Sequence, residues 1–221
     1  MKDIKVCVFD AYGTLFDVHS ASRKMKMDIG ENYEEFSNLW RAKQLEYSFL
    51  REIMNEYKSF FSVTEDALVY AMKTYNIKVE LKENLMDLYK KLDAYKEVEN
   101  VLKKLQERGI KTAILSNGSY DMLNDATQTS GIKKYLDEVI SVEEIERFKP
   151  SKEVYEMVNN KFGIKDNKKI VFFSSNGWDI AGATSYGFNT IWVNRFNKEV
   201  EELDFKPRFI VENLEEAIKK F

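Results

Sequence analysis

Short runs of consecutive apolar residues recur along this chain, and longer stretches with helical spacing separate them. The first run, residues 4–9, is mostly apolar and β-branched, which is typical of a strand buried on both faces of a parallel sheet. Similar runs follow at residues 111–115, 138–140, 169–173 and 190–193, with an edge strand at 208–211. Because amphipathic stretches lie between these runs, the pattern predicts an α/β fold with a doubly wound parallel sheet.

The pattern changes between the first run and the second. Across residues 20–95 the apolar positions follow helical spacing, and no strand is indicated. Thr64, followed by two acidic residues, predicts the N-terminus of one of these helices. We therefore expect a helical cap subdomain of residues 18–95, inserted into a Rossmann-like core domain formed by residues 1–17 and 96–221.

Three of the predicted strands end in clusters of polar residues. These clusters are Asp10–Thr14, Ser116–Ser119 and Ser174–Asp179. Since the carboxyl ends of parallel strands share one edge of the sheet, the clusters converge on one crevice, with Lys149 at the same edge. A lysine near carboxylates favours their ionised form, which a nucleophilic Asp10 requires. The alternatives are that Asp10 only caps the next segment and that Lys149 is a surface lysine.

Composition narrows the class of protein. The 221 residues are 44% hydrophobic and 32% charged, with a net charge of only −3, which supports a large core and argues against a nucleic-acid partner. No run approaches the ~20 apolar residues of a membrane span, and no secretory signal precedes the first strand. Cys7 is the one cysteine and His19 the one histidine of the sequence, which excludes an intrachain disulfide and a histidine-rich metal site. We expect a soluble, cytoplasmic protein.

Four motifs, in order and spread over nearly the whole chain, resemble those of the haloacid dehalogenase superfamily. They are Asp10-Ala11-Tyr12-Gly13-Thr14-Leu15, the strand end Ser116-Asn117, Lys149-Pro150, and the loop Ser174–Asp179. The helical insertion lies where this family has its cap. A finer resemblance to the type II L-2-haloacid dehalogenases rests on residues 40–47 (WRAKQLEY), 115–119 (LSNGS), 174–179 (SSNGWD) and 192–195 (WVNR).

The resemblance implies hydrolysis of short L-2-haloacids to D-2-hydroxyacids with inversion of configuration. Asp10 would attack the halogen-bearing carbon in line, displace halide and form an ester. Water held near Asp179, the implied general base, would then hydrolyse the ester with help from Asn176. The resemblance further implies a homodimer whose small-molecule partners are haloacid and water, with no cofactor.

Further roles follow from the same resemblance. Ser116 and the backbone amides around Ala11 and Asn117 would hold the substrate carboxylate. Arg41 of the cap, together with Asn117, would receive the departing halide. Thr14 would hydrogen-bond the nucleophile or the loops around it.

The resemblance also describes the surroundings of the nucleophile. Lys149, tied to Ser174 and Tyr155, would set the charge and orientation of Asp10. An apolar pocket around the substrate carbon would strip water from the carboxylate before attack. The residues implied for this pocket are Tyr12, Leu45, Phe60 and Trp178. Ala42 stands where the family commonly has a larger polar residue, which points to a wider pocket.

Two other functions stay open at this stage. Phosphatases of the superfamily carry a second Asp two residues after the nucleophile and hold Mg²⁺ with acidic residues of the last motif. Here Tyr12 takes the first position, and residues 174–176 are Ser, Ser and Asn. We therefore expect no metal site, which disfavours a Mg²⁺-dependent phosphatase. A binding protein without turnover is the third reading, although a binder has no need of a nucleophile, a lysine and a second aspartate together.

Overall fold

The structure, a computed structural model, describes residues 1 and 3–221 of the chain. Within these residues, six strands form one all-parallel sheet in the order β3-β2-β1-β4-β5-β6. Their bounds are β1 Val6–Phe9, β2 Lys111–Ser116, β3 Glu138–Ser141, β4 Ile170–Ser174, β5 Asn189–Val193 and β6 Phe209–Val211. Each strand begins and ends within two residues of a predicted run. The predicted doubly wound α/β fold is confirmed.

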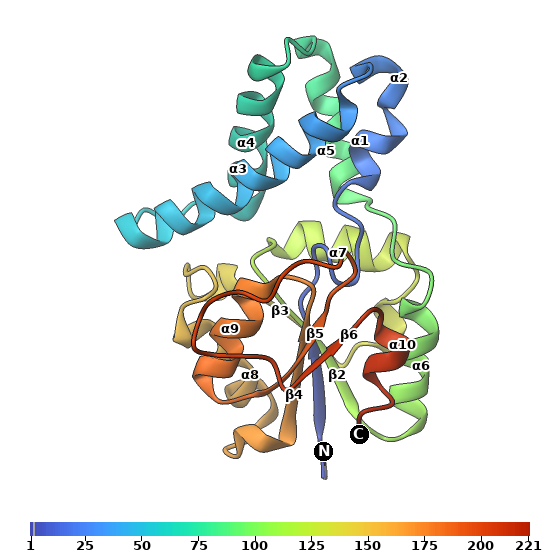
Figure 1. The fold of residues 1–221 in the computed structure, drawn as a ribbon, viewed down its shortest axis with the longest axis vertical. Helices are drawn as coiled ribbons and strands as arrows, with labels where there is room; N and C mark the ends of the chain where they lie inside the picture. Colours follow the sequence, from blue (N-terminus) through green and yellow to red (C-terminus); the bar gives the residue numbers. More distant parts are fainter. Residues whose placement is uncertain (2) are drawn as a thin grey trace.

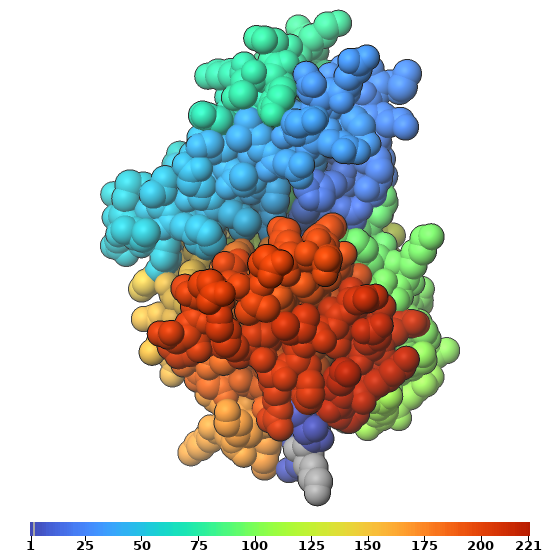
Figure 2. Space-filling model, in the orientation of Figure 1, coloured from blue at the N-terminus to red at the C-terminus, as the bar shows by residue number. Residues whose placement is uncertain are grey.

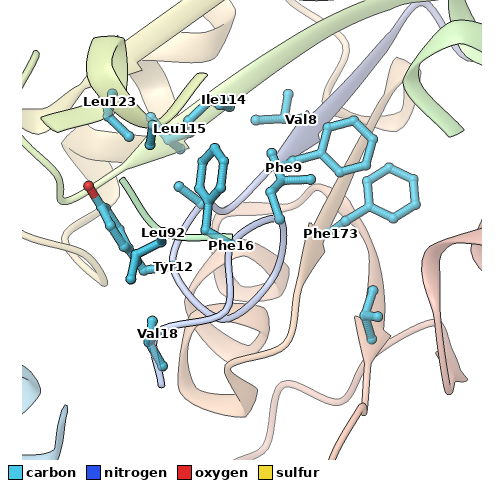
Figure 3. Close-up of a cluster of buried hydrophobic side chains, with 14 of the residues drawn as sticks. Val8, Phe9, Tyr12, Phe16, Val18, Leu92, Ile114, Leu115, Leu123 and Phe173 are labelled. Atoms are coloured by element: carbon cyan, nitrogen blue, oxygen red, sulfur yellow. The ribbon is translucent and has the colours of Figure 1, made fainter. Parts of the chain in front are cut away.

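The two central strands, β1 and β4, are completely buried, which is why both appear as unbroken apolar runs. In the sheet register Phe9 lies opposite Ile114 on one side and Phe173 on the other. The rings of Phe9 and Phe173 stack with their centroids 4.7 Å apart, as Figure 3 shows. The apolar cluster around these two strands continues through Phe16 towards Val18 at the edge of the sheet unit.

The strand order places a crevice at the carboxyl ends of β1 and β4. The chain runs outward from β1 to β2 and β3, and then returns to begin β4 on the other side of β1. Ligands of open α/β sheets bind at such a reversal, outside the carboxyl ends of the strands. Asp10 follows β1 directly, and Ser174 is the last residue of β4.

Helices cover both faces of the sheet. Their bounds are α6 Val98–Glu107, α7 Tyr120–Thr129, α8 Lys152–Phe162, α9 Gly177–Tyr186 and α10 Leu214–Ala217, with short 3₁₀ turns η2 Lys133–Tyr135, η3 Val142–Glu144 and η4 Asn167–Lys169. Figure 1 shows α6 and α10 on one face and α8 and α9 on the other. The polar cluster after β4 is shorter than predicted, because α9 begins at Gly177. Trp178 and Asp179 therefore lie in the first turn of a helix.

Between β1 and α6 lies a group of helices that we call the helical insertion. Its elements are α1 Ser20–Lys24, α2 Lys26–Ile29, α3 Tyr33–Met54, α4 Phe60–Thr74, η1 Val79–Leu81 and α5 Lys82–Lys90. The two connections to the sheet unit run side by side, since Asp17 N–H donates to Asp93 O at 2.8 Å and Tyr95 N–H donates to Leu15 O at 3.0 Å. In the described part of the chain, no helix is long and apolar enough to cross a membrane.

The helical insertion sits over the crevice end of the sheet unit. Figure 1 shows α3 lying across this boundary, and Figure 2 shows the surface of the insertion in contact with the sheet unit along it. The predicted helix start at Thr64 is wrong. α4 begins at Phe60, because Ser59 Oγ accepts a hydrogen bond from Ser62 N–H at 3.2 Å and so caps the helix. Thr64 instead lies inside α4, where its hydroxyl donates to Phe60 O at 2.6 Å.

Candidate active site

Asp10 lies at the centre of the crevice and is only 6% exposed. Its N–H donates to Phe173 O at 2.9 Å, which fixes the backbone at the end of β1. The turn that follows needs a left-handed residue, and Gly13 supplies it with φ of +92°. One carboxylate oxygen, Oδ2, accepts from Thr14 Oγ1 at 3.0 Å, Asn176 Nδ2 at 2.8 Å and Ser174 Oγ at 3.4 Å. Three donors therefore converge on a single oxygen.

The other oxygen, Oδ1, faces Lys149. The ammonium of Lys149 is fully buried and bridges two carboxylates, with Nζ 3.1 Å from Asp10 Oδ1 and 2.9 Å from Asp179 Oδ2. Burial lowers the pKa of Lys149, but the charges of the two carboxylates outweigh this effect, and the pKa ends above its ordinary value. Lys149 is therefore a fixed cation between Asp10 and Asp179.

Asp179 is also fully buried, in the first turn of α9. Its Oδ1 accepts from the hydroxyl of Tyr155 at 2.8 Å. Burial raises the pKa of Asp179 to about 6, with Lys149 and the Tyr155 hydroxyl opposing the rise. A carboxyl group with a pKa close to neutrality can exchange a proton during a reaction.

One predicted contact is wrong in detail. Lys149 Nζ bonds neither Ser174 nor Tyr155; it bonds the two aspartates, and the hydroxyls bind those aspartates from the other side. The reason is charge, because a buried ammonium is stabilised far more by two carboxylates than by two hydroxyls.

Ser116 and Asn117, at the end of β2, lie beside this group. The side chain of Ser116 accepts from Gly118 N–H at 3.0 Å and so holds the turn after the strand. Asn117 Oδ1 accepts from the backbone N–H of Lys149 at 2.9 Å. The strand end and the lysine loop are therefore joined directly.

Arg41 reaches the same site from α3 of the helical insertion. Its guanidinium donates to Tyr12 O at 3.2 Å, to Asn176 Oδ1 at 3.5 Å and to Gln44 Oε1 at 2.6 Å. Gln44 is buried and also accepts from the hydroxyl of Tyr89 at 3.0 Å. Arg41 is thus held in position from both sides of the boundary.

A small cavity separates Arg41 from the Asp10 group. Its volume is about 10 Å³ for the centre of a water-sized sphere, which is close to the space of one water molecule. The residues around it are Asp10, Tyr12, Arg41, Leu45, Phe60, Ser116, Asn117, Lys149, Asn176 and Trp178. Every predicted pocket side chain is among them.

Other predicted residues lie behind this wall. Asp179 and Tyr155 are hidden by Lys149, while Thr14, Ser174 and the buried Ala11 support the turn under Asp10. Ala42 is exposed on α3 and does not line the cavity, so the wider pocket expected at this position is not seen.

Three residues near the site were not predicted. Gln44 lies one turn after Arg41, a spacing at which helix side chains meet, and this signal was available in the sequence. Phe49 packs edge-on against Trp178 with ring centroids 5.0 Å apart. Arg195 donates to Thr14 O at 2.9 Å from 181 positions away, a contact that only the fold reveals.

The side chains of the site, within the described residues, do not form a metal-binding site. Within residues 1 and 3–221, no group of three or more His, Cys, Asp or Glu side chains could hold a metal ion. The two buried aspartates of the site share a different cation, because the ammonium of Lys149 is in contact with both carboxylates. The donor set therefore suits an internal lysine.

Known proteins are similar to this chain in sequence and in fold. A model of the haloacid dehalogenase-like hydrolases matches residues 4–187. The chain is 42% identical over 210 residues to a protein named (S)-2-haloacid dehalogenase 1 from Pseudomonas sp. (strain CBS-3), covering 94% of this chain and 92% of that protein. The match therefore extends over nearly the full length of both proteins.

Solved structures agree with the sequence comparison. One described as a dehalogenase is 37% identical, has a TM-score of 0.97 and covers 100% of this chain and 98% of its own. The L-2-haloacid dehalogenase from Xanthobacter autotrophicus, solved with chloropropionic acid covalently bound, is 33% identical with a TM-score of 0.89 and covers 98% and 97% of the two chains.

Proposed function

The chain belongs to the haloacid dehalogenase-like hydrolases, and we propose that it hydrolyses short L-2-haloacids to D-2-hydroxyacids through an ester on Asp10. The observation that carries this proposal is the environment of the Asp10 carboxylate. It is buried, paired with Lys149, and lies on a small cavity with Arg41 on the opposite side. Such a carboxylate is a poorly hydrated anion that is held ready for attack on carbon.

The two oxygens of Asp10 have different tasks in this mechanism. Oδ2 is occupied by three donors, whereas Oδ1 has the single partner Lys149, so Oδ1 keeps a free lone pair and attacks the substrate carbon. Halide leaves from the opposite side of that carbon with the bonding electron pair, and the configuration inverts. A halide leaves without protonation, so no acid is needed where Tyr12 stands, and Tyr12 Oη has no hydrogen-bond partner among the described residues.

Hydrolysis then uses the donors on Oδ2. Once Oδ1 carries the ester, Oδ2 is its carbonyl oxygen, and water attack at the Asp10 side-chain carbon places negative charge on Oδ2. Thr14, Asn176 and Ser174 already point donors at this atom, so they stabilise the charge without reorganisation. Collapse of this intermediate breaks the bond between the Asp10 side-chain carbon and Oδ1, and Oδ1 leaves as the hydroxyl oxygen of the hydroxyacid with the proton that Asp179 has accepted. The water oxygen stays on Asp10, whose carboxyl group loses its remaining proton and becomes the carboxylate again.

Asp179 accepts the proton of the attacking water in this scheme. It lies behind Lys149, so the water must stand beside Lys149 Nζ, between the two aspartates. The pKa of Asp179 near 6 leaves it ionised at neutral pH yet basic enough to take a proton. The positive charge of Lys149 stabilises the negative charge on Asp179 and around Asp10 while that proton moves.

Substrate placement follows from the remaining cavity wall. Ser116 and the backbone amides near Ala11 and Asn117 hold the substrate carboxylate, and Arg41 with Asn117 receives the halide. The side chains of Tyr12, Leu45, Phe60 and Trp178 surround the substrate carbon. The cavity has room for little more than one water molecule, so its lining must move apart to admit a haloacid. Because Arg41, Leu45 and Phe60 of the helical insertion form one side of it, we infer that the insertion moves away from the sheet unit.

A direct assay tests the function. Chloride release from L-2-chloropropionate, with D-lactate as the product and the D-enantiomer as control, is the expected result, with no added metal. Phosphate release from a generic phosphate ester, assayed with Mg²⁺, should be absent. Phosphatase activity without chloride release would overturn the proposal, and the absence of both would leave the binding-protein reading.

The same framework extends to organisation and assembly. We propose a core domain of residues 1–17 and 96–221 with a cap of residues 18–95, a homodimer, and a cytoplasmic location. Support for the dimer comes from the last turns of α3, where Leu50, Ile53 and Met54 are 44%, 80% and 58% exposed. Light scattering tests this: a monomeric wild type would contradict it, and Ile53→Glu should dissociate a dimer formed through this face. Cell fractionation tests the location.

A further inference from the structure

Among residues 1 and 3–221, two residues of α3 make side-chain hydrogen bonds to the sheet unit. Arg41, which lies in the cavity wall, is one of them. Glu52, at the far end of the same helix, is the other. They are eleven positions apart, which corresponds to about 16 Å along a helix at about 1.5 Å per residue. α3 is therefore attached to the sheet unit at two separate points.

Glu52 grips one short segment of the sheet unit, residues 147–151, which we call the lysine segment. Its carboxylate accepts from Arg147 Nε, from the backbone N–H of Phe148 and from Ser151 Oγ, each at 2.6 Å. Burial raises the pKa of Glu52, but these hydrogen bonds outweigh burial and hold the pKa below its ordinary value. The group is therefore charged at neutral pH, and its partners are a cation and a backbone amide close to the N-terminus of α8.

The lysine segment carries Lys149 at its centre. The partners of Glu52 are the two residues before Lys149, and also Ser151, two residues after it, so Glu52 contacts the segment on both sides of Lys149 and binds its backbone at Phe148. The insertion also packs on the segment through Tyr57 and Phe60, whose rings lie 5.1 and 6.3 Å from that of Phe148. From the core side, Asn117 holds the backbone N–H of Lys149.

We propose that Glu52 is a closing latch and a positioning residue, which couples closure of the helical insertion to the placement of Lys149 between Asp10 and Asp179. This inference rests on the proposed function for its kinetic consequence. When the insertion opens to admit substrate, the three bonds to Glu52 break and the lysine segment loses one of its two supports. When the insertion closes, the same bonds restore the segment as Arg41 returns to the cavity.

The test compares Glu52→Ala and Glu52→Gln with the matched control Glu46→Ala. Glu46 lies on the same helix, is 48% exposed and, in the described part of the chain, forms an ion pair with Lys43 alone. Three hydrogen bonds to a charged group are lost in Glu52→Ala, so the rate of ester formation on Asp10, followed by rapid-quench mass spectrometry, should fall about 10- to 100-fold. Glu52→Gln keeps one acceptor oxygen, so its rate of ester formation should lie between those of the wild type and Glu52→Ala. Glu46→Ala should match the wild type.

A second readout does not depend on turnover. Hydrogen exchange of the Phe148 amide, which donates to Glu52, should be slow in the wild type, slower with the unreactive analogue propionate, and fast in both Glu52 variants. Circular dichroism verifies that each variant is folded. If a Glu52 variant does not fold, Arg147→Met, which breaks the same contact from the sheet unit, is tested in its place. Combined with Glu52→Ala, Arg147→Met should add little, because both break the same contact.

The outcomes separate the two proposals. If the Phe148 amide of folded Glu52→Ala exchanges as slowly as in the wild type, Glu52 does not hold the lysine segment and the latch is overturned. If the amide exchanges faster but the rate of ester formation is unchanged, the coupling of the latch to Lys149 is overturned. If the wild type releases no chloride, the proposed function fails, while Phe148 exchange still decides whether Glu52 holds the lysine segment.

Discussion

Replacing Tyr155 by Phe removes one oxygen from the centre of the site and leaves the rest of the side chain in place. The ring is buried and packs edge-on against Phe172 and Phe188, with centroids 5.8 and 6.3 Å away, so Phe occupies the same space. What disappears is the hydroxyl that donates to Asp179 Oδ1 at 2.8 Å. This hydrogen bond stabilises the charged form of Asp179, and its loss must raise the pKa of that carboxyl group.

The size of the shift follows from the strength of the bond. A hydrogen bond to a charged group contributes about 1.5–3 kcal/mol, and one pKa unit corresponds to about 1.4 kcal/mol, so the pKa of Asp179 should rise by about 1–2 units. From a wild-type pKa of about 6 it moves to about 7–8 in Tyr155→Phe. The ionised fraction of Asp179 at pH 7, and with it the rate of ester hydrolysis, should fall by up to about tenfold.

The assay separates the two chemical steps. A rapid-quench experiment follows the ester on Asp10 by mass spectrometry, and its decay rate is measured against pH. In the wild type the decay rate should fall at acid pH, in a limb that lies below about pH 6, because esterification removes the Asp10 charge that helps to raise the pKa of Asp179. In Tyr155→Phe this acid limb of the pH profile should lie about 1–2 units higher. An acid limb that stays at the wild-type pH would refute the assignment of Asp179 as the base that Tyr155 tunes.

The same shift in the pKa of Asp179 predicts a pH-dependent loss of folding stability in Tyr155→Phe. The folded-state pKa of Asp179 is raised, so ionising this group works against the fold, and the penalty grows as the pH rises through about 6. Tyr155→Phe enlarges the penalty by about 1.5–3 kcal/mol at alkaline pH and by much less where Asp179 is protonated in both proteins. Urea unfolding at two pH values measures the difference. Equal losses at both would contradict the reasoning.

A second substitution reaches Tyr155 from the other side. A Cβ at Gly182 would overlap Tyr155 Oη and stand 2.7 Å from Pro150 Cβ. Gly182→Ala should therefore push the hydroxyl away from Asp179 and shift the acid limb in the same direction. In the Tyr155→Phe background the hydroxyl is already absent, so adding Gly182→Ala should move the limb no further.

The remaining predictions concern the nucleophile, metals and the halide. Asp10→Asn should abolish ester formation with the fold intact by circular dichroism; turnover in freshly prepared protein without deamidation would refute the role of Asp10. Chloride release should survive EDTA, and a loss that Mg²⁺ restores would favour phosphatase-like chemistry. Arg41→Lys keeps the charge but loses the planar donor fork, so ester formation should slow about tenfold; an unchanged rate would leave Asn117 as the better halide acceptor.

The sequence was most informative about the sheet. Buried parallel strands appear as short apolar runs, and all six were predicted to within two residues. The convergence of Asp10, Ser174 and Ser116 then followed from topology, because the carboxyl ends of parallel strands share an edge. Lys149 could be placed at that edge, but its contacts could not, since the choice between hydroxyl and carboxylate partners depends on side-chain conformations inside the core.

The sequence was least informative about α3 and α4. The C-terminal part of α3, which ends at Met54, carries Phe49 and Glu52, and both contact the sheet unit. Helical periodicity shows which face of a helix is apolar, but it does not show where a separate unit packs. The contact between Glu52 and Arg147, 95 positions apart, has no local signal.

The position of β1 at the centre of the sheet has a consequence for how this enzyme is made. Asp10 is synthesised near the start of the chain, but Lys149 follows 139 positions later and Asn176 166 positions later. At about 5–20 residues per second, a ribosome needs about 10–30 s to supply these partners. Throughout that time Asp10 is an ordinary carboxylate, without the paired ammonium and the donors that make it reactive. The nascent chain therefore cannot be alkylated by its own substrate before the protein is able to hydrolyse the ester again.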